Sequence, residues 1–159
     1  WSWNDLGFRM PVTGKLQTVF ILVTAIVSIE IIYIGWGHTG NSDVIDESFG
    51  GVSSVSVNWK LFYLAWFFTI APLLEELLFR GAILKILSQS EVAGIWVGLV
   101  FQSVIFTAMH YTFANAVPIF LFSIILGIVY ILTKSIWLPV ITHSFTNFMT
   151  LIAVAYGLI

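Results

Sequence analysis

The chain alternates between long runs of hydrophobic residues and shorter polar stretches. Five runs are long enough for a helix that crosses a bilayer, which needs about 20 mostly apolar residues. They are Leu16–Gly35, Leu61–Phe79 (its helix continuing to about Leu87), Val92–Tyr111, Ala116–Thr133 and Trp137–Gly157. Because most connections between them are short, neighbouring helices are expected to run antiparallel. The pattern predicts an all-α, polytopic transmembrane helix bundle with about five spans.

Two polar stretches flank or interrupt these runs. Residues 1–15 are polar and aromatic and contain Pro11, so we expect them to lie at the membrane interface as a lead-in to the first span. Residues 37–58 form a long polar loop with three acidic residues and no Lys or Arg, expected outside the membrane. No internal repeat is evident, and residues 1–159 are interpreted as a single transmembrane domain.

Composition supports the membrane interpretation. Hydrophobic residues make up 59% of the chain and charged residues 9%, and the mean hydropathy is +1.01. A soluble domain carries roughly a quarter charged residues. The net charge of −2 argues against a nucleic-acid partner. The absence of cysteine excludes disulfides, thiolate catalysis and thiolate metal ligands.

The basic residues predict an orientation. Only Lys60 falls on one side of the predicted topology, and the other five fall opposite it: Arg9, Lys15, Arg80, Lys85 and Lys134. Cytoplasmic loops carry an excess of Lys and Arg. The N-terminus is therefore expected to be cytoplasmic.

The segment PLLEELLFRG, from Pro72 to Gly81, places three charges in the second span. Glu76 and Arg80 are four residues apart with the acid first, the favourable order for an intrahelical ion pair. Glu75 points about 100° away from Glu76 around the helix and is left without a partner. Intramembrane ionisable residues mark functional sites, and a spare carboxylate is suited to proton transfer. The alternative is that both acids face water at a helix end.

Further polar residues lie on two later spans. His110 ends the third span, with Phe106 one turn earlier on the same face. His143 and Asn147 are four apart on the fifth span. A lone helical His is more often a core or interface residue. Here, however, two histidines and Asn147 lie on spans other than the one that carries Glu75. This distribution predicts that the four side chains converge on one polar cavity within the bilayer.

Two other features have structural and functional interpretations. Pro72 frees a carbonyl one turn earlier, which either opens the backbone toward a cavity or only kinks the helix. Gly94 and Gly98 form a GxxxG pattern, which favours close helix packing within the chain over a dimer interface.

Three motifs occur in order on successive hydrophobic segments: Glu75-Glu76-x-x-x-Arg80, Phe106-x-x-x-His110 and His143-x-x-x-Asn147. Together they resemble the CPBP family of CAAX-type prenyl-protein endopeptidases and bacteriocin-processing enzymes, also called the Abi family. The LGFR stretch from Leu6 to Arg9 is similar to that family's lead-in. The resemblance extends from about Leu6 to the end of the chain. It implies an all-helical intramembrane protease whose site lies in a conical cavity inside the bilayer.

The resemblance also implies roles for the motif residues. Glu75 would activate a water molecule and His110 would assist it. His143 and Asn147 would donate hydrogen bonds to the oxyanion. The remaining motif residues would support these four: Glu76, Arg80 and Phe106.

The family is described either as metalloproteases or as glutamate-dependent enzymes without a catalytic metal. No H-E-x-x-H motif occurs on one helix, which favours the metal-free description and no cofactor. The alternative is a zinc ion held by Glu75, His110 and His143, a His₂Glu ligand set.

The sequence therefore predicts an integral membrane endopeptidase that cleaves membrane-associated peptides or protein tails. About five spans are fewer than in the eukaryotic CAAX enzymes, which fits either the compact prokaryotic branch of the family or a truncated chain. On the first interpretation we expect a prokaryotic plasma membrane. The expected partners are membrane lipid and a peptide or protein-tail substrate. Two alternatives remain open: a non-proteolytic scaffold, immunity or accessory subunit in a membrane protein complex, and a proton-coupled transporter.

Overall fold

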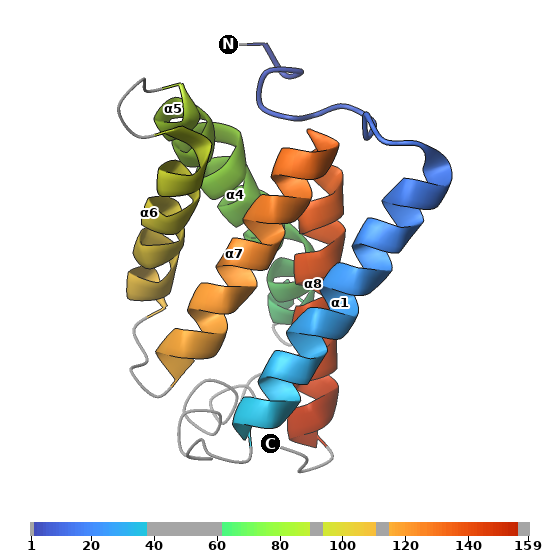
Figure 1. The fold of residues 1–159 in the computed structure, drawn as a ribbon. Coiled ribbons are helices and arrows are strands. Elements are labelled where there is room, and N and C mark those ends of the chain that lie inside the picture. Colours follow the sequence, from blue (N-terminus) through green and yellow to red (C-terminus); the bar gives the residue numbers. More distant parts are fainter. Residues whose placement is uncertain (1, 38–61, 90–93, 111–114, 156–159) are drawn as a thin grey trace.

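The computed structural model describes residues 2–37, 62–89, 94–110 and 115–155, and within these ranges it is a bundle of helices without strands (Figure 1). The expected all-α class is confirmed. The first helix is α1 (Lys15–Gly37), and the later ones are α6 (Gly94–Met109), α7 (Ala116–Thr133) and α8 (Trp137–Ala155). The expected loop at 37–58 lies almost entirely outside the described residues.

The second expected span is one continuous helix, Phe62–Ser88. Its register changes along its length, through the π-helical segment η1 (Trp66–Ile70), α4 (Ala71–Glu76), a second π-helical segment η2 (Leu77–Leu84) and α5 (Lys85–Ser88). Segments of π-helix are rare and are frequently found at functional sites. Here the two π segments flank the α-helical turns that carry Glu75 and Glu76.

Three helices of the described part are long and apolar enough to cross a membrane: Lys15–Gly35, Phe62–Ser88 and Ala116–Thr133. Together with the family described below, they support an integral membrane protein. Helix α6 is apolar but shorter, with 16 residues. Helix α8 has 19 residues and is not among these three helices of the described part. Five complete spans therefore stay a prediction.

Helix α7 lies between α6 on one side and α1 and α8 on the other (Figure 1). A buried core joins four elements through Ile29 of α1, Phe79 of η2, Phe106 of α6 and Phe122 of α7. The outer surface is strongly apolar; Leu16 and Phe20, for example, are 84% and 71% exposed. An apolar exterior around buried charges is the arrangement expected of a protein surrounded by lipid.

The GxxxG glycine Gly98 serves packing within the chain. A Cβ atom there would lie 2.9 Å from Cβ of Leu87. The absence of a side chain therefore lets α6 approach the end of the preceding helix closely.

The lead-in crosses one end of the bundle and is fastened to the connection between α7 and α8 (Figure 1). The Ile136 amide donates to the Gly7 carbonyl at 2.8 Å, and the Ser135 hydroxyl donates to the Arg9 carbonyl at 2.7 Å. Gly7 has a φ of +89°, and a Cβ atom there would lie 2.8 Å from Cε2 of Tyr130. Only glycine fits this position comfortably.

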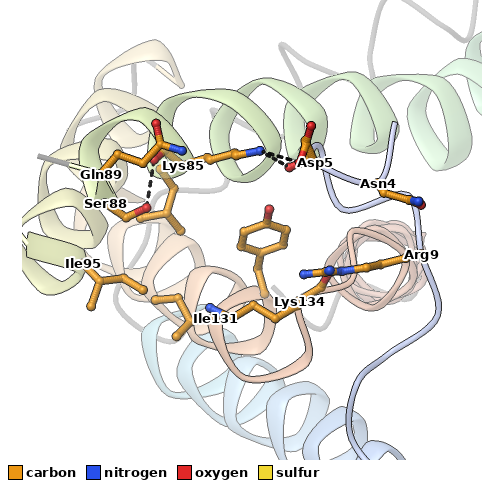
Figure 2. Close-up of a pocket in the computed structure, with 11 residues that line it drawn as sticks. Asn4, Asp5, Arg9, Lys85, Ser88, Gln89, Ile95, Ile131 and Lys134 are labelled. Atoms are coloured by element: carbon orange, nitrogen blue, oxygen red, sulfur yellow. Dashed lines mark hydrogen bonds and ion pairs between the residues drawn. The ribbon is translucent and has the colours of Figure 1, made fainter. Parts of the chain in front are cut away.

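The basic residues divide into two groups. Arg9, Lys85 and Lys134 lie together at the lead-in end of the bundle (Figure 2). Arg80 does not belong with them, because it is fully buried inside the bundle. Arg80 therefore does not belong among the residues that predict the orientation, because its guanidinium has protein partners inside the bundle. The orientation of the N-terminus stays a prediction.

Candidate active site

Three elements bring Glu75, His110 and His143 together. Glu75 lies on α4, His110 directly follows α6, and His143 lies on α8. Oε2 of Glu75 is 3.8 Å from Nε2 of His110 and 3.8 Å from Nε2 of His143. This oxygen is buried and accepts no hydrogen bond from the described residues. The convergence of these three side chains, expected from the sequence, is present.

Both imidazole rings are held by their other nitrogen. Nδ1 of His110 is 2.8 Å from the Phe106 carbonyl oxygen, and Nδ1 of His143 is 2.9 Å from Oε1 of Glu76. A carbonyl can only accept, and so can an ionised carboxylate. In each ring Nδ1 therefore carries the hydrogen, and Nε2 faces Glu75.

The end of α6 explains the spacing of Phe106 and His110. The helix stops at Met109, and the His110 amide donates to Thr107 at 3.1 Å instead of to Phe106. The Phe106 carbonyl is thus available to the imidazole. The Phe106 ring also stacks on the His110 ring, with centroids 4.4 Å apart and an interplanar angle of 28°. Phe106 fixes His110 through both its backbone and its side chain.

Glu76 and Arg80 form the ion pair that their spacing predicts. Nη1 of Arg80 donates to Oε1 of Glu76 at 2.9 Å, and both side chains are fully buried. The alternative in which both acids face water is therefore wrong for Glu76. The guanidinium carbon also lies 5.0 Å from the centre of the Phe106 ring, an arrangement suited to a cation–π contact.

Sequence reasoning missed the residues that complete the Arg80 environment. Nη2 of Arg80 donates to both the carbonyl and the hydroxyl oxygen of Ser123 on α7, each at 3.0 Å. Nε2 of Gln102 on α6 lies 3.4 Å from the same hydroxyl. The signal available in the sequence was a polar residue, Gln102 or Ser123, in the middle of each apolar run. Such a side chain requires a hydrogen-bond partner when it is buried.

The site has a closed face and an open face. Glu76 and Arg80 are inaccessible, whereas the side chains of Glu75 and His110 are about a third exposed, at 33% and 35%. A reactant can therefore reach Glu75 from one side while the ion pair stays shielded on the other. The expected polar cavity stays a prediction; the cavity described below is lined by other residues.

Asn147 lies on α8 one turn after His143 and contacts a neighbouring backbone. Its Nδ2 donates to the Phe67 carbonyl at 3.0 Å. In this stretch the Ala71 amide bonds to the Trp66 carbonyl, five residues back. The next residue, Pro72, has no N–H to offer to Phe67. The carbonyl one turn before the proline thus receives a hydrogen bond from Asn147, which ties α8 to η1.

The same geometry bears on the metal alternative. No group of three or more His, Cys, Asp or Glu residues in the described part of the chain is arranged to hold a metal ion. Glu75, His110 and His143 have the donor types of a His₂Glu site but not the arrangement. We therefore derive no catalytic step through zinc.

The chain is similar to known proteins over the region that contains these motifs. Residues 57–149 match a family model described as type II CAAX prenyl endopeptidase Rce1-like. An Escherichia coli protein described as an uncharacterized 24.3 kDa protein is 29% identical over 142 residues, covering 84% of this chain and 64% of its own length. No solved structure matches. The family match contains all three motifs.

Proposed function

The chain belongs to the Rce1-like family of type II CAAX prenyl endopeptidases, and on this premise we propose that it is an intramembrane endopeptidase that cleaves membrane-associated peptides or protein tails. One observation carries the proposal: Oε2 of Glu75 is 3.8 Å from each of two Nε2 atoms. Each ring is fixed by its Nδ1 atom, so the three groups are preoriented. Preorganised acid–base groups are what peptide hydrolysis requires.

In the proposed reaction Glu75 is the general base. A separation of 3.8 Å is too long for a direct hydrogen bond, but one water molecule can bridge such a distance. We place the attacking water between Glu75 and His110. Glu75 accepts one proton from this water, and Nε2 of His110 accepts a hydrogen bond from its other O–H. The water oxygen then attacks the carbonyl carbon of the scissile peptide bond.

Collapse of the tetrahedral intermediate returns the proton. Glu75, now protonated, gives its proton to the peptide nitrogen as the C–N bond breaks. The products are a new carboxylic acid and a free amine, which exchange a proton to become a carboxylate and an ammonium group, and Glu75 is again a carboxylate. One side chain serves first as base and then as acid, so no other proton donor is needed.

The oxyanion is stabilised by His143 and Asn147. With Nδ1–H held on Glu76, His143 donates from Nε2 only after that atom gains a proton. The proton that Glu75 took from the water passes to Nε2 across 3.8 Å while the oxyanion exists, and it returns to Glu75 before the leaving nitrogen is protonated. The Asn147 amide has two hydrogens. One is directed to Phe67, and the second is the proposed oxyanion donor. Removal of one such donor costs about 3–4 kcal/mol of transition-state stabilisation.

The reaction is proposed to need no metal. Activity should then survive a strong chelator such as 1,10-phenanthroline, with no gain when zinc is added back. Loss of activity on chelation and its recovery with zinc would establish the metalloenzyme alternative.

The test is peptide cleavage by the purified chain in lipid vesicles. The substrates are a library of membrane-spanning peptides and C-terminal tails, with and without a prenyl group, and products are identified by mass spectrometry in ¹⁸O-enriched water. We expect discrete cleavage with one ¹⁸O in each new carboxylate, and its loss in Glu75→Gln. Glu30→Gln is the matched control, because Glu30 is a membrane-span glutamate outside all three motifs.

Two results would contradict the proposal. One is a folded wild-type chain that cleaves no peptide of the library, which would favour a non-proteolytic scaffold or subunit. The other is a Glu75→Gln variant that cleaves as fast as the wild type. A comparison of cleavage rates for prenylated and unprenylated tails determines separately whether the substrates are prenylated proteins.

A further inference from the structure

A second site lies at the end of the bundle that the lead-in crosses. A cavity of about 250 Å³ opens there between the lead-in, the end of α5, the start of α6 and the end of α7 (Figure 2). Its charged lining residues are Arg9, Lys85 and Lys134, together with Asp5. None of these residues belongs to the catalytic motifs.

The charge of this cavity is positive, although the whole chain carries −2. Asp5 is ionised: hydrogen bonds from the Ser2 amide and hydroxyl, and then the nearby Lys85 ammonium, hold the pKa of its carboxyl below the usual value. Among the described lining residues, three cations and one carboxylate leave two net positive charges, since 3 − 1 = 2. A concave surface with this charge favours an anion.

Arg9 and Lys134 retain donors for a ligand in the cavity. Arg9 uses Nε to bond the Lys134 carbonyl at 2.8 Å, which leaves both terminal amino groups of its guanidinium for a ligand. The Lys134 side chain makes no hydrogen bond within the described ranges, so it does not simply cap helix carbonyls. Lys85 bonds the Asp5 carbonyl at 2.7 Å and lies across the cavity from Lys134 (Figure 2).

The remaining lining indicates the kind of anion. Leu84, Ile95 and Ile131 supply apolar walls beside the charges, and the helices that form the cavity are apolar segments ending at this level. A phospholipid combines a phosphate with an apolar chain at the same depth. Basic pockets between membrane helices bind anionic headgroups in this way.

We propose that this cavity binds a phosphate group, supplied by the headgroup of an anionic membrane phospholipid. The phosphate bridges Arg9 of the lead-in, Lys85 of α5 and Lys134 at the end of α7. Bound lipid thereby fastens the lead-in to two helix ends. This inference is independent of the proposed peptidase activity.

The test compares lipid retention by the full chain in nanodiscs that contain phosphatidylglycerol and phosphatidylcholine. Native mass spectrometry of the released protein should show retained phosphatidylglycerol in excess of its share. Lys134→Asn should weaken this retention about fivefold, the effect expected from one basic residue near a charged headgroup. Asparagine suits the left-handed backbone of Lys134, whose φ is 53°.

Lys15→Gln is the matched control, because Lys15 begins α1 and does not line the cavity. Equal losses in Lys134→Asn and Lys15→Gln, or no preference for phosphatidylglycerol, would overturn the proposal. Arg9→Gln should also weaken retention, but it removes a bond that holds the lead-in, so Lys134→Asn decides the result.

A second arm separates the two sources of phosphate. In an uncharged detergent, dilauroyl phosphatidylglycerol should raise the thermal unfolding temperature of the wild type, and at the same lipid concentration it should raise that of Lys134→Asn less. Glycerol 1-phosphate alone should not raise it. If glycerol 1-phosphate stabilises the wild type as strongly as the lipid does, the membrane source is wrong and the cavity takes a soluble phosphate ester.

Discussion

Nδ1 of His143 lies 2.9 Å from Oε1 of Glu76. The same oxygen accepts a hydrogen bond from Arg80 at 2.9 Å. The buried ion pair is therefore continuous with an imidazole that faces Glu75. Because the Glu76 carboxylate is paired with Arg80 and accepts the Nδ1 hydrogen, the pair determines which nitrogen of His143 points at the reacting groups.

Glu76→Gln should impair catalysis, because a neutral side chain no longer offsets the positive charge that His143 gains when its Nε2 atom is protonated in the proposed reaction. A glutamine can turn its NH₂ group toward Nδ1, which would move the imidazole hydrogen to Nε2. We expect kcat to fall by about 10²–10⁴-fold with little change in KM, a range bounded by the loss that a wrong tautomer causes in a serine protease triad. The ¹⁵N chemical shifts of His143 should show the changed tautomer, and a purely structural role for Glu76 would leave them unaltered.

Arg80→Met should destabilise the fold. It leaves the Glu76 carboxylate buried without its guanidinium, which costs about 3–5 kcal/mol. Unfolding free energies in mixed micelles would measure this, with Lys85→Met as a control whose partly exposed pair with Asp5 contributes at most about 1 kcal/mol.

The double variant Arg80→Met, Glu76→Gln should be more stable than Arg80→Met alone, because the buried charge is then gone. Equal unfolding free energies for Arg80→Met and Lys85→Met would show that the pair is not the stabilising element described here.

The variant Asn147→Ala tests two hydrogen bonds of the Asn147 amide, the one to Phe67 in the structure and the proposed one to the oxyanion. Loss of the bond to Phe67 should lower the unfolding free energy by about 1 kcal/mol. Loss of an oxyanion donor should lower kcat by about 10²–10³-fold. If the variant is less stable but cleaves at the wild-type rate, Asn147 has only the structural role of binding the backbone of η1, and it is not an oxyanion donor.

Gly7→Ala should loosen the lead-in. Alanine there adopts an unfavourable positive φ and meets the Tyr130 ring at 2.8 Å, at a cost of about 1–3 kcal/mol. Amide exchange at Ile136, which donates to the Gly7 carbonyl, should become faster. Gly14→Ala, whose nearest neighbour is 3.7 Å away, should change little; similar exchange in both variants would contradict the packing described.

The sequence predicted the features that depend on local spacing. The helix at Ala116–Thr133 has the expected ends, because its apolar run stops where the polar connections begin. The Glu76–Arg80 pair follows from a separation of four residues on one helix. The convergence of Glu75 with two histidines was also predictable, since polar groups in lipid gather where they can share a site.

The features that depend on how helices rotate against one another were not predictable. Contact between His143 and Glu76 joins residues 67 positions apart, and no periodic pattern specifies it. The two π-helical segments leave no mark in the hydrophobic pattern, because the whole stretch is apolar. The contacts of Arg80 with the carbonyl and hydroxyl oxygens of Ser123 on α7 are likewise visible only in the folded chain.

The most direct measurement is the set of kcat/KM values for Glu75→Gln, His110→Gln and the double variant on one cleaved peptide. Glu75 and His110 are proposed to act on the same water, so each single change should reduce kcat/KM by about 10³-fold or more. The double variant should then be no more than a few-fold slower than the slower single variant. Losses that multiply, or a single variant that keeps the wild-type rate, would contradict a shared catalytic unit at Glu75 and His110.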